Sequence, residues 1–334
     1  MFVPCTLDRS SGRLFCCPWG VLPGFLLAAL LGACERGSPA SSATSAAAAM
    51  SSPNGVSPRY LKGQLHLHSH NSGDSATSPH EVVRWYGEHD YDFVVFTDHN
   101  RVTRLESPGR PLVFAGAELT RNLETCAPAP GASSYCPLHM NALFLADTAP
   151  FAIKWPVPSA RARRLDVYRA ELAFTQRHGG LAQLNHPNFH YAADGELIAE
   201  LAQEGVALLE VANEAMDSNN RGDEQHPSTE QLWDDALTLG ARVWGVATDD
   251  AHQYDDAAAV VAKRGWAHTG DLGFVMVRAK PEAESIQDAL RRGDFYGSNG
   301  LFLRDVTATP RELLVQVAGE AACTVRFIGA GGRV

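Results

Sequence analysis

Two histidines separated by a single residue, His66 and His68, are the first side chains whose types and spacing suit metal chemistry. In a β-strand, residues two apart point to the same side. A strand here therefore places both imidazoles together, while Leu65 and Leu67 face a core. Imidazole is a common ligand of zinc, copper, iron and nickel. A lone His-x-His motif is weak evidence of a metal site, and its weight depends on its neighbours.

Further ionisable residues follow near the ends of the strands that the sequence predicts. They are Asp74, Asp98, His99, Glu118, His139, His186, Asp249, Asp250 and His252. The apolar runs that predict strands cover residues 64–68, 93–97, 113–118, 140–145, 181–185, 207–211, 243–248 and 273–277. In β/α barrels the carboxyl ends of the strands converge on one active-site mouth, so these side chains are expected to meet there. Imidazole and carboxylate together suit zinc, manganese or iron rather than calcium.

The elements that must position these residues alternate between short apolar runs and longer amphipathic ones, which is typical of an α/β fold. Helices are expected to begin after Ser78 and Ser228, because Glu81 and Gln231 complete capping boxes three residues later. A third helix is expected at residues 160–178. About seven β/α units favour a closed barrel over an open sheet. A dinucleotide-binding sheet lacks support, because no Gly-x-Gly-x-x-Gly follows a strand.

The chain divides into four predicted segments. Residues 1–34 resemble a lipoprotein signal peptide, because the apolar run at 21–31 is short for a membrane span and the lipobox-like Leu31-Gly32-Ala33-Cys34 follows it. The alternative is an ordinary secretory signal in which Cys34 is incidental. Residues 35–57 are Ser-, Ala-, Gly- and Pro-rich and predict a flexible linker. Residues 58–300 form the catalytic domain, and alternating strands at 301–334 predict a small β extension.

The predicted export bears on two cysteines of the catalytic domain. Cys126 and Cys136 bracket a Pro-, Gly- and Ser-rich loop, where an oxidising compartment favours a disulfide. Free thiols are the alternative. If the lipobox functions, the domain is tethered to a bacterial membrane by a lipid on Cys34, in the periplasm or outside the cell.

The ionisable motifs resemble, in their order, those of the PHP (polymerase and histidinol phosphatase) superfamily. The resemblance covers roughly Gly63 to Gln253 and rests on His66-Leu67-His68, Asp74, Thr97-Asp98-His99, Glu118, His139, Asn185-His186-Pro187 and Asp250-Ala251-His252. The stretch at residues 295–300 looks more like the CehA/McbA-like subgroup. The resemblance implies a distorted (β/α)7 PHP-type barrel.

The resemblance also implies two or three divalent metal ions, which would be zinc, manganese or iron. Mapped by motif, the first would be held by His66, His68, Glu118 and Asp250. Glu118 would bridge to a second ion, which His139 and His186 complete. A third would be held by Asp74, His99 and His252, and Asp74 stands where some family members have histidine.

Two such ions would lower the pKa of a bridging water towards about 7, and the resulting hydroxide would attack a phosphorus or carbonyl centre. Asp98 and Asp249 are not mapped as ligands and are expected to orient ligand imidazoles. The leaving group would be protonated by His252, Asp249 or a metal-bound water.

Substrate contacts are expected from side chains that follow the ligand-bearing strand ends. Arg101 and Arg121 could each clamp an anion through two hydrogen bonds. His190, Asn213 and Ser298 are further candidates. Five other histidines are expected at the surface, at positions 80, 89, 178, 226 and 268.

The formal charge of −10 argues against a nucleic-acid-binding surface, since phosphate backbones are bound through clustered Lys and Arg. A small anionic substrate remains compatible, because bound metal ions would reverse the local field. The leading hypothesis is a metal-dependent hydrolase acting on a small phosphate ester. The alternatives are a carbamate, amide or ester hydrolase of the CehA/McbA type and a non-catalytic metal-binding lipoprotein.

Overall fold

The computed structural model describes residues 59–130, 134–156, 162–309, 311–319 and 324–333, together with two short strands near the amino terminus. These are β1 (Cys5–Asp8) and β2 (Arg13–Cys16), which pair antiparallel inside the segment expected to be a signal peptide, where the sequence predicts no strand. The apolar run at 21–31, Cys34 and the expected linker lie outside the described residues. In the described part, no helix is long and apolar enough to cross a membrane.

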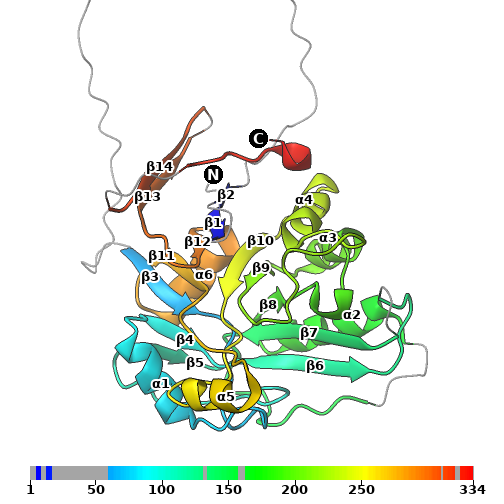
Figure 1. Cartoon of the computed structure of the whole chain (residues 1–334), viewed down its shortest axis with the longest axis vertical. Coiled ribbons are helices and arrows are strands. Elements are labelled where there is room, and N and C mark those ends of the chain that lie inside the picture. Colours follow the sequence, from blue (N-terminus) through cyan, green and yellow to red (C-terminus); the bar gives the residue numbers. More distant parts are fainter. Residues whose placement is uncertain are drawn as a thin grey trace, which may run out of the picture.

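The first of two larger sheets has five strands in the order β12-β11-β3-β4-β5 (Figure 1). Their bounds are β3 (Arg59–Gln64), β4 (Phe93–Val95), β5 (Leu112–Phe114), β11 (Phe274–Ala279) and β12 (Phe295–Ser298). Strands β3, β4 and β5 run parallel, whereas β11 runs antiparallel to both β3 and β12.

The second sheet also has five strands, in the order β10-β9-β8-β7-β6. Their bounds are β6 (Ala117–Leu123), β7 (Cys136–Leu143), β8 (Leu181–Leu184), β9 (Leu208–Asn213) and β10 (Trp244–Thr248). Strands β8, β9 and β10 run parallel, but β7 runs antiparallel to β6 and β8. The sheet is therefore mixed, and not all of its strands end at the same edge.

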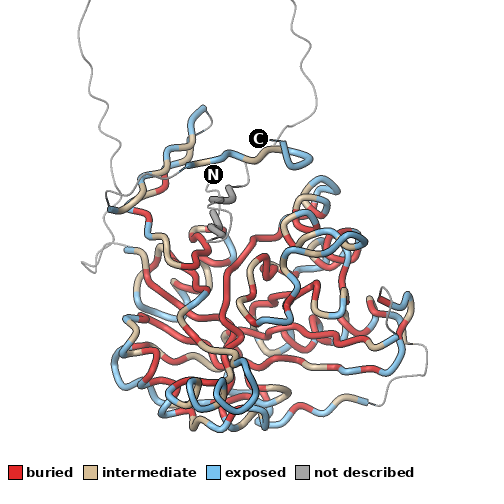
Figure 2. The backbone as a smooth tube through the Cα atoms, viewed as in Figure 1, coloured by how far each residue is buried: buried red, intermediate tan, exposed pale blue. Residues whose placement is uncertain are grey.

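The two sheets share one buried core. Val95 of β4 packs in the same apolar cluster as Leu208 of β9 and Val246 of β10, and all three are fully buried. Figure 2 shows buried backbone along both sheets and exposed backbone on the outer turns and helices. Gly116 lies between β5 and β6, where a Cβ atom would approach the Phe96 carbonyl oxygen to 2.6 Å. Close packing at the passage between the sheets therefore requires glycine there.

Two isolated bridges link the sheets at the end of β3 and β4. One pairs Leu67 with Ala251, and the other pairs His99 with Glu118. The α/β fold expected from the sequence is confirmed. The expected closed barrel of seven β/α units is not present as one sheet, because the strands described in the first and second sheets belong to two separate hydrogen-bonded ladders.

The part of the chain that the structure describes contains six α-helices. Their bounds are α1 (Pro79–Glu88), α2 (Arg164–Arg177), α3 (Gly195–Glu204), α4 (Thr229–Thr238), α5 (Ala257–Arg264) and α6 (Ala283–Arg292). The two capping boxes expected at Ser78 and Ser228 are present at the starts of α1 and α4. Helices α2, α3 and α4 lie beside the second sheet (Figure 1).

A β-hairpin follows the last strand of the first sheet, in the region where the sequence predicts strands without helices. It consists of β13 (Leu303–Ala308) and β14 (Leu313–Val317), which pair antiparallel. Arg278 of β11 donates a hydrogen bond to the Val306 carbonyl oxygen at 3.1 Å and also contacts Asp305. A short 3-10 helix, η2 (Ala330–Gly332), lies near the end of the chain.

Candidate metal centre

Glu118 lies at the centre of a group of histidines and is 1% exposed. One carboxylate oxygen, Oε1, lies 3.1 Å from Nδ1 of His139 and 3.3 Å from Nε2 of His186. The other oxygen, Oε2, lies 2.7 Å from Nδ1 of His99 and 3.5 Å from Nε2 of His68. Burial raises the pKa of Glu118, but the charges of His99 and His139 outweigh it and hold this pKa well below its usual range.

Asp250 supplies a second buried carboxylate to the same group. Its Oδ1 lies 3.2 Å from Nε2 of His66 and 3.1 Å from Nε2 of His68. His66 also has Nε2 3.5 Å from Oε1 of Glu118. The two imidazoles of the His-x-His motif therefore lie between two carboxylates, and both are buried.

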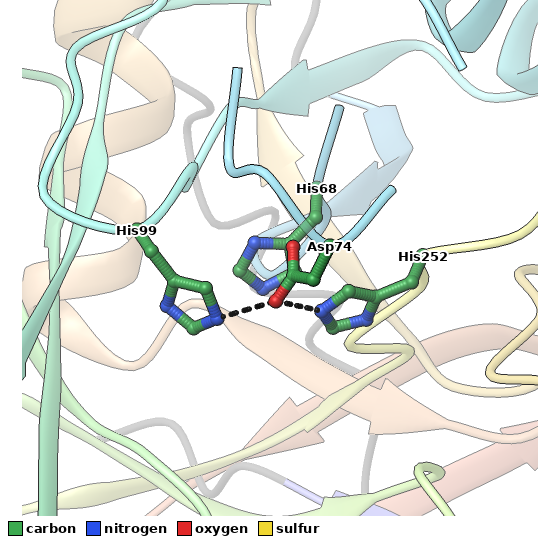
Figure 3. Close-up of side chains that lie close together, drawn as sticks. All are labelled: His68, Asp74, His99 and His252. Atoms are coloured by element: carbon green, nitrogen blue, oxygen red, sulfur yellow. Dashed lines mark ion pairs between the residues drawn. The ribbon is translucent and has the colours of Figure 1, made fainter. Parts of the chain in front are cut away.

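A third group lies at the more exposed side of the cluster. Figure 3 shows the carboxylate of Asp74 between the imidazoles of His99 and His252, with His68 beside them. Oδ2 of Asp74 lies 3.0 Å from Nε2 of His99 and 3.3 Å from Nε2 of His252. Because the Asp74 side chain is 44% exposed, this group is open to solvent, unlike Glu118.

The structure brings all nine expected ligand residues together in four overlapping groups. In each group the ligand atoms lie within 4.8 Å of one another. The groups are His68-Asp74-His99-His252, His66-His68-Glu118, His66-His186-Asp250 and Glu118-His139-His186. Among the described residues, the buried atoms Nε2 of His66, Nδ1 of His139 and Oε2 of Glu118 have no hydrogen-bond partner. Buried polar atoms without partners are costly, and a divalent cation would satisfy them.

The route by which two ligands reach the centre differs from the sequence prediction. The apolar runs predict that Glu118 ends a strand and that His139 opens one. Glu118 is instead the second residue of β6, and His139 lies inside β7. Because β7 runs antiparallel to its neighbours, these ligands come from the body of the sheet rather than from carboxyl ends. The expected convergence holds for His186 and Asp250, which follow the parallel strands β8 and β10.

Glu210 is a buried carboxylate of the centre that the sequence motifs do not identify. It lies in β9 and is fully buried. Its Oε1 lies 2.7 Å from Nδ1 of His66, and its Oε2 accepts a hydrogen bond of 2.7 Å from the backbone N–H of His186. Thr248 and Asn213 also donate to this carboxylate, at 2.7 and 2.9 Å. The sequence feature that could have identified Glu210 is its position as an acidic residue within the apolar run Leu208-Leu209-Glu210-Val211.

Asp98 and Asp249 do not have the roles expected for them. Asp98 accepts hydrogen bonds from the backbone N–H and hydroxyl of Ser69, at 2.7 and 2.9 Å, and contacts the hydroxyl of Thr103. It therefore fixes the turn after His68 rather than orienting an imidazole.

The carboxylate of Asp249 is saturated with donors from elsewhere in the fold. They are Nε2 of Gln64 at 2.6 Å, the hydroxyl of Tyr86 at 3.0 Å, and the backbone N–H groups of residues 271, 272 and 273 at 2.9, 2.8 and 2.8 Å. Burial raises the pKa of Asp249 to about 6 despite these donors. Asp249 therefore anchors the loop before β11, and its oxygens are not available to a leaving group.

Arg121 is placed away from the centre by the alternation of side chains along β6. Its neighbours Thr120 and Asn122 contact His99 and His139, both expected ligands, at 2.7 and 2.8 Å. Arg121 is 8% exposed and lies 5.2 Å from the centre of the Trp155 ring. The anion clamp expected of Arg121 is not formed, since residues one apart on a strand point to opposite sides.

The other candidate substrate residues differ in where the structure places them. Arg101 is exposed and lies 5.6 Å from the ring of Phe151. Ser298 is buried in β12 and donates to the carbonyl oxygen of Leu301 at 2.6 Å, so it supports a turn. Asn213 donates to Glu210 and also to Oδ2 of Asp250 at 3.3 Å, so it positions carboxylates of the centre.

Two histidines expected at the surface take part in ring contacts near the centre or its loops. The ring of His268 lies 5.5 Å from that of His252, and its side chain is 13% exposed. His226 stacks on Tyr191 at 3.5 Å. Spacing in the sequence gave no signal for either contact, because both depend on loops that meet only in the fold.

Glu171 of α2 is a buried carboxyl group on the side of β6 and β7 that holds Arg121. Both of its carboxylate oxygens lack a hydrogen-bond partner among the described residues. Burial raises the pKa of Glu171 well above its usual range, and Arg121 offsets this only in part. Ionising Glu171 therefore costs more in the folded chain than in the unfolded chain.

The raised pKa of Glu171 predicts a stability that falls as pH rises from the unfolded-state pKa through the folded-state pKa. We expect Glu171→Gln to remove this loss and to be more stable than the wild type at pH 8. The two proteins should differ less at pH 5. Urea unfolding at both pH values measures the difference. An equal difference at the two pH values would contradict the assignment.

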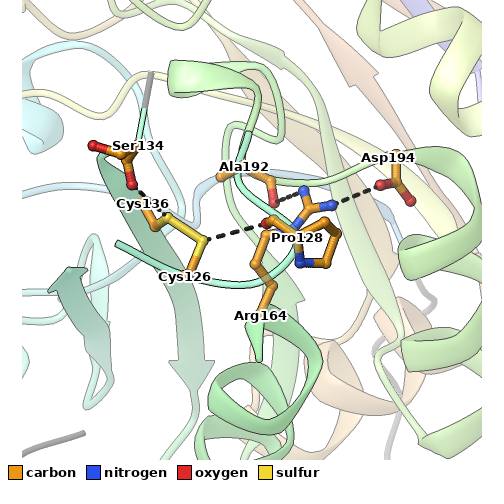
Figure 4. The surroundings of a disulfide bond; sticks show 7 residues. All are labelled: Cys126, Pro128, Ser134, Cys136, Arg164, Ala192 and Asp194. Carbon is orange, nitrogen blue, oxygen red and sulfur yellow. Dashed lines mark hydrogen bonds and ion pairs between the residues drawn. A yellow bond between two sulfur atoms is a disulfide. The ribbon is translucent and has the colours of Figure 1, made fainter. Parts of the chain in front are cut away.

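Cys126 and Cys136 form a disulfide, the first of the two alternatives that the sequence left open (Figure 4). The bond joins positions ten residues apart, and Cys136 begins β7, which carries His139. Closing a loop of this length lowers the entropy of the unfolded chain.

We expect the double variant Cys126→Ser/Cys136→Ser to lose about 3 kcal/mol of unfolding free energy. The measurement is guanidinium unfolding of the oxidised proteins. Wild-type protein unfolded in the presence of a reductant is the matched control and should lose the same amount. If reductant leaves the wild type unchanged while the double variant is destabilised, the loss comes from packing and not from the cross-link.

A scan against models of protein families found no match, and a search of curated proteins found none either. A search of solved structures found a protein from Bifidobacterium adolescentis whose assignment as a metal-dependent phosphoesterase is itself provisional. The match has a TM-score of 0.38 and 14% sequence identity, and it covers 59% of this chain and 90% of that chain. The match thus takes in part of this chain and most of that structure.

Proposed function

We propose that this protein is a metal-dependent hydrolase that acts on a small anionic ester, with phosphate esters as the leading substrate class. The observation that carries the proposal is the position of Glu118, whose two oxygens face histidines of all four candidate ligand groups. Carboxylates shared between neighbouring ligand groups are suited to hold two cations close together.

Nine residues would hold the ions. His66, His68, Glu118 and Asp250 would hold one, Glu118 with His139 and His186 a second, and Asp74 with His99 and His252 a third. The mixed nitrogen and oxygen donors suit zinc, manganese or iron. When bound, such ions activate water as a nucleophile and stabilise negative charge on substrate oxygens.

The chain's own residues prepare the centre for this chemistry. Glu210 fixes the ring of His66 through Nδ1, which leaves Nε2 directed at Glu118 and Asp250. Asn213 holds Asp250 through the carboxylate oxygen that does not face the imidazoles. The buried position of Glu118 excludes bulk water from the inner groups, whereas Asp74 remains open on the side from which a substrate can approach.

The proposal extends to architecture and location. We propose a PHP-type arrangement, supported by the order of the motifs and by the bridges that join the two sheets beside His99 and Glu118. We also propose export and a lipid anchor on Cys34, on the basis of the amino-terminal sequence. The substrate is a small molecule, and membrane contact would be made only through the lipid. The acidic chain does not favour nucleic acid as a partner.

The test is elemental analysis and enzyme assay of the protein without residues 1–34. We expect two or three metal ions per chain and chelator-sensitive release of phosphate from a chromogenic phosphate ester. Ester or carbamate cleavage without phosphate release would favour the alternative hydrolase. Bound metal without any turnover would favour a non-catalytic binding protein, and a folded protein that takes up no metal would contradict the proposal.

A variant pair separates catalysis from binding alone. Asp250→Asn should lower the metal content and reduce turnover by at least about 10³-fold, since the metals provide several kcal/mol of stabilisation. Asp147→Asn is the matched control, because Asp147 has a fully exposed side chain. Its metal content and turnover should equal those of the wild type. Equal turnover in the two variants would contradict the assignment of Asp250 as a metal ligand.

A further inference from the structure

A line of rings leads outward from two of the expected metal ligands. The ring of Phe189 lies 5.2 Å from that of His186 and 6.1 Å from that of His139. The ring of His190 lies 4.8 Å from Phe189 and 5.0 Å from Tyr135. Phe189 and Tyr135 are partly exposed, and His190 is exposed. We refer to Tyr135, Phe189 and His190 as the aromatic rim.

The backbone of the aromatic rim is held in a conformation that its residues do not favour. His190 has φ of 51° and Tyr191 has φ of 54°, although neither is glycine. Two successive left-handed residues other than glycine persist only where the surrounding structure holds them, and they concentrate at ligand-binding sites. This turn positions the ring of Phe189 beside that of His186.

Contacts with the loop between β9 and α4 hold the turn. The buried side chain of Asn188 donates to the carbonyl oxygens of Asn219 and Pro227, at 3.1 and 2.9 Å. The hydroxyl of Tyr191 donates to Asp223 at 2.6 Å, and its ring stacks on His226 at 3.5 Å. The turn is therefore fixed on both sides of Phe189 and His190.

Two further anchors hold the ends of the aromatic rim. Arg164 of α2, which is 5% exposed, donates to the carbonyl oxygen of Ala192 at 2.8 Å and to Asp194 at 3.0 Å (Figure 4). Tyr135 directly precedes Cys136 of the disulfide. The backbone that carries the rings is thus held before any ligand binds, which lowers the entropy cost of binding.

We propose that the aromatic rim is a specificity site that binds a planar aromatic or heteroaromatic group on the substrate, next to the ester that the metal centre cleaves. This inference rests on the proposed function. Partly exposed rings favour offset or edge-to-face contact with another ring. Phe189 lies beside both histidines of the Glu118-His139-His186 group, so a ring bound there is adjacent to the reacting group. The exposed imidazole of His190 can hydrogen-bond to a heteroatom of the same group.

The test compares two phosphonates that carry the same anionic head and differ only in the presence of a ring. Binding of phenylphosphonate and methylphosphonate to the metal-loaded protein is measured by calorimetry. We expect the wild type to bind phenylphosphonate about tenfold more tightly. Phe189→Ala should reduce the ratio of the two affinities to near one, and His190→Ala should reduce it in part.

The control is Phe302→Ala, which removes a phenylalanine that is 45% exposed and lies outside the aromatic rim. This variant should keep the wild-type ratio, and melting temperatures of all variants should show that each is folded. A wild-type ratio near one, or a ratio that Phe189→Ala does not change, would overturn the specificity site while leaving the metal centre intact. If neither phosphonate binds the metal-loaded wild type, the proposed function fails and this inference fails with it.

Discussion

Glu118→Gln should lose at least about 10³-fold in turnover, because it removes the negative charge shared between the inner ligand groups. The amide keeps the size of the side chain but presents an N–H₂ group in place of one oxygen. One of the imidazole nitrogens that now faces a carboxylate oxygen would then face a donor. The metal content should fall by more than one ion per chain, since Glu118 belongs to two of the four candidate groups.

The measurement is metal content together with turnover at saturating added metal. Glu106→Gln provides a matched control, because Glu106 is an exposed glutamate in a loop without regular structure. It should behave as the wild type does. If Glu118→Gln kept its full metal content and lost only turnover, Glu118 would act on the substrate and not as a shared ligand.

Glu210→Ala should be the most damaging change outside the nine expected ligands. The substitution leaves His66, Thr248 and Asn213 without the carboxylate that they contact in a fully buried position. Removing one partner of a buried charged pair costs about 3–5 kcal/mol. We therefore expect a loss of this size in unfolding free energy, measured by urea denaturation of the metal-free protein.

Glu210→Gln separates the orienting role from the structural one. The amide oxygen can still accept from Nδ1 of His66, so most of the fold stability should remain. Without the negative charge, however, His66 becomes a weaker ligand, and metal affinity should fall by about 10–100-fold. Competition with a chromogenic chelator measures this affinity. Unchanged affinity in Glu210→Gln would show that Glu210 supports the fold only.

Much of the candidate centre could be predicted from local sequence. The His-x-His motif predicts two imidazoles on one face, and the structure has both His66 and His68 buried and 5.2 Å apart between ring centres. The capping boxes at Ser78 and Ser228 mark helix starts to the residue. The helix starts depend on the first turn of a helix, which a short stretch of sequence specifies. The strand expected at 64–68 instead ends at Gln64, so His66 and His68 lie just beyond β3.

The direction of the strands could not be predicted from local sequence. The alternation of strands and helices predicted parallel strands throughout, but β7 follows β6 through a disulfide-closed loop and returns antiparallel. The inward placement of His139 therefore comes from its register opposite Thr120. Register depends on pairing with a neighbouring strand, and single-strand patterns carry no information about it.

The sequence by itself determined which residue types can form a metal centre, the α/β class of the fold and the helix starts, because each depends on spacing along one element. Only the tertiary structure decided that Glu118 is shared between groups, that Glu210 orients His66, and that Arg121 faces away. The same holds for the aromatic rim, whose rings come from turns held by other loops. These outcomes depend on contacts between segments far apart in the chain, which form only when the two sheets pack against each other.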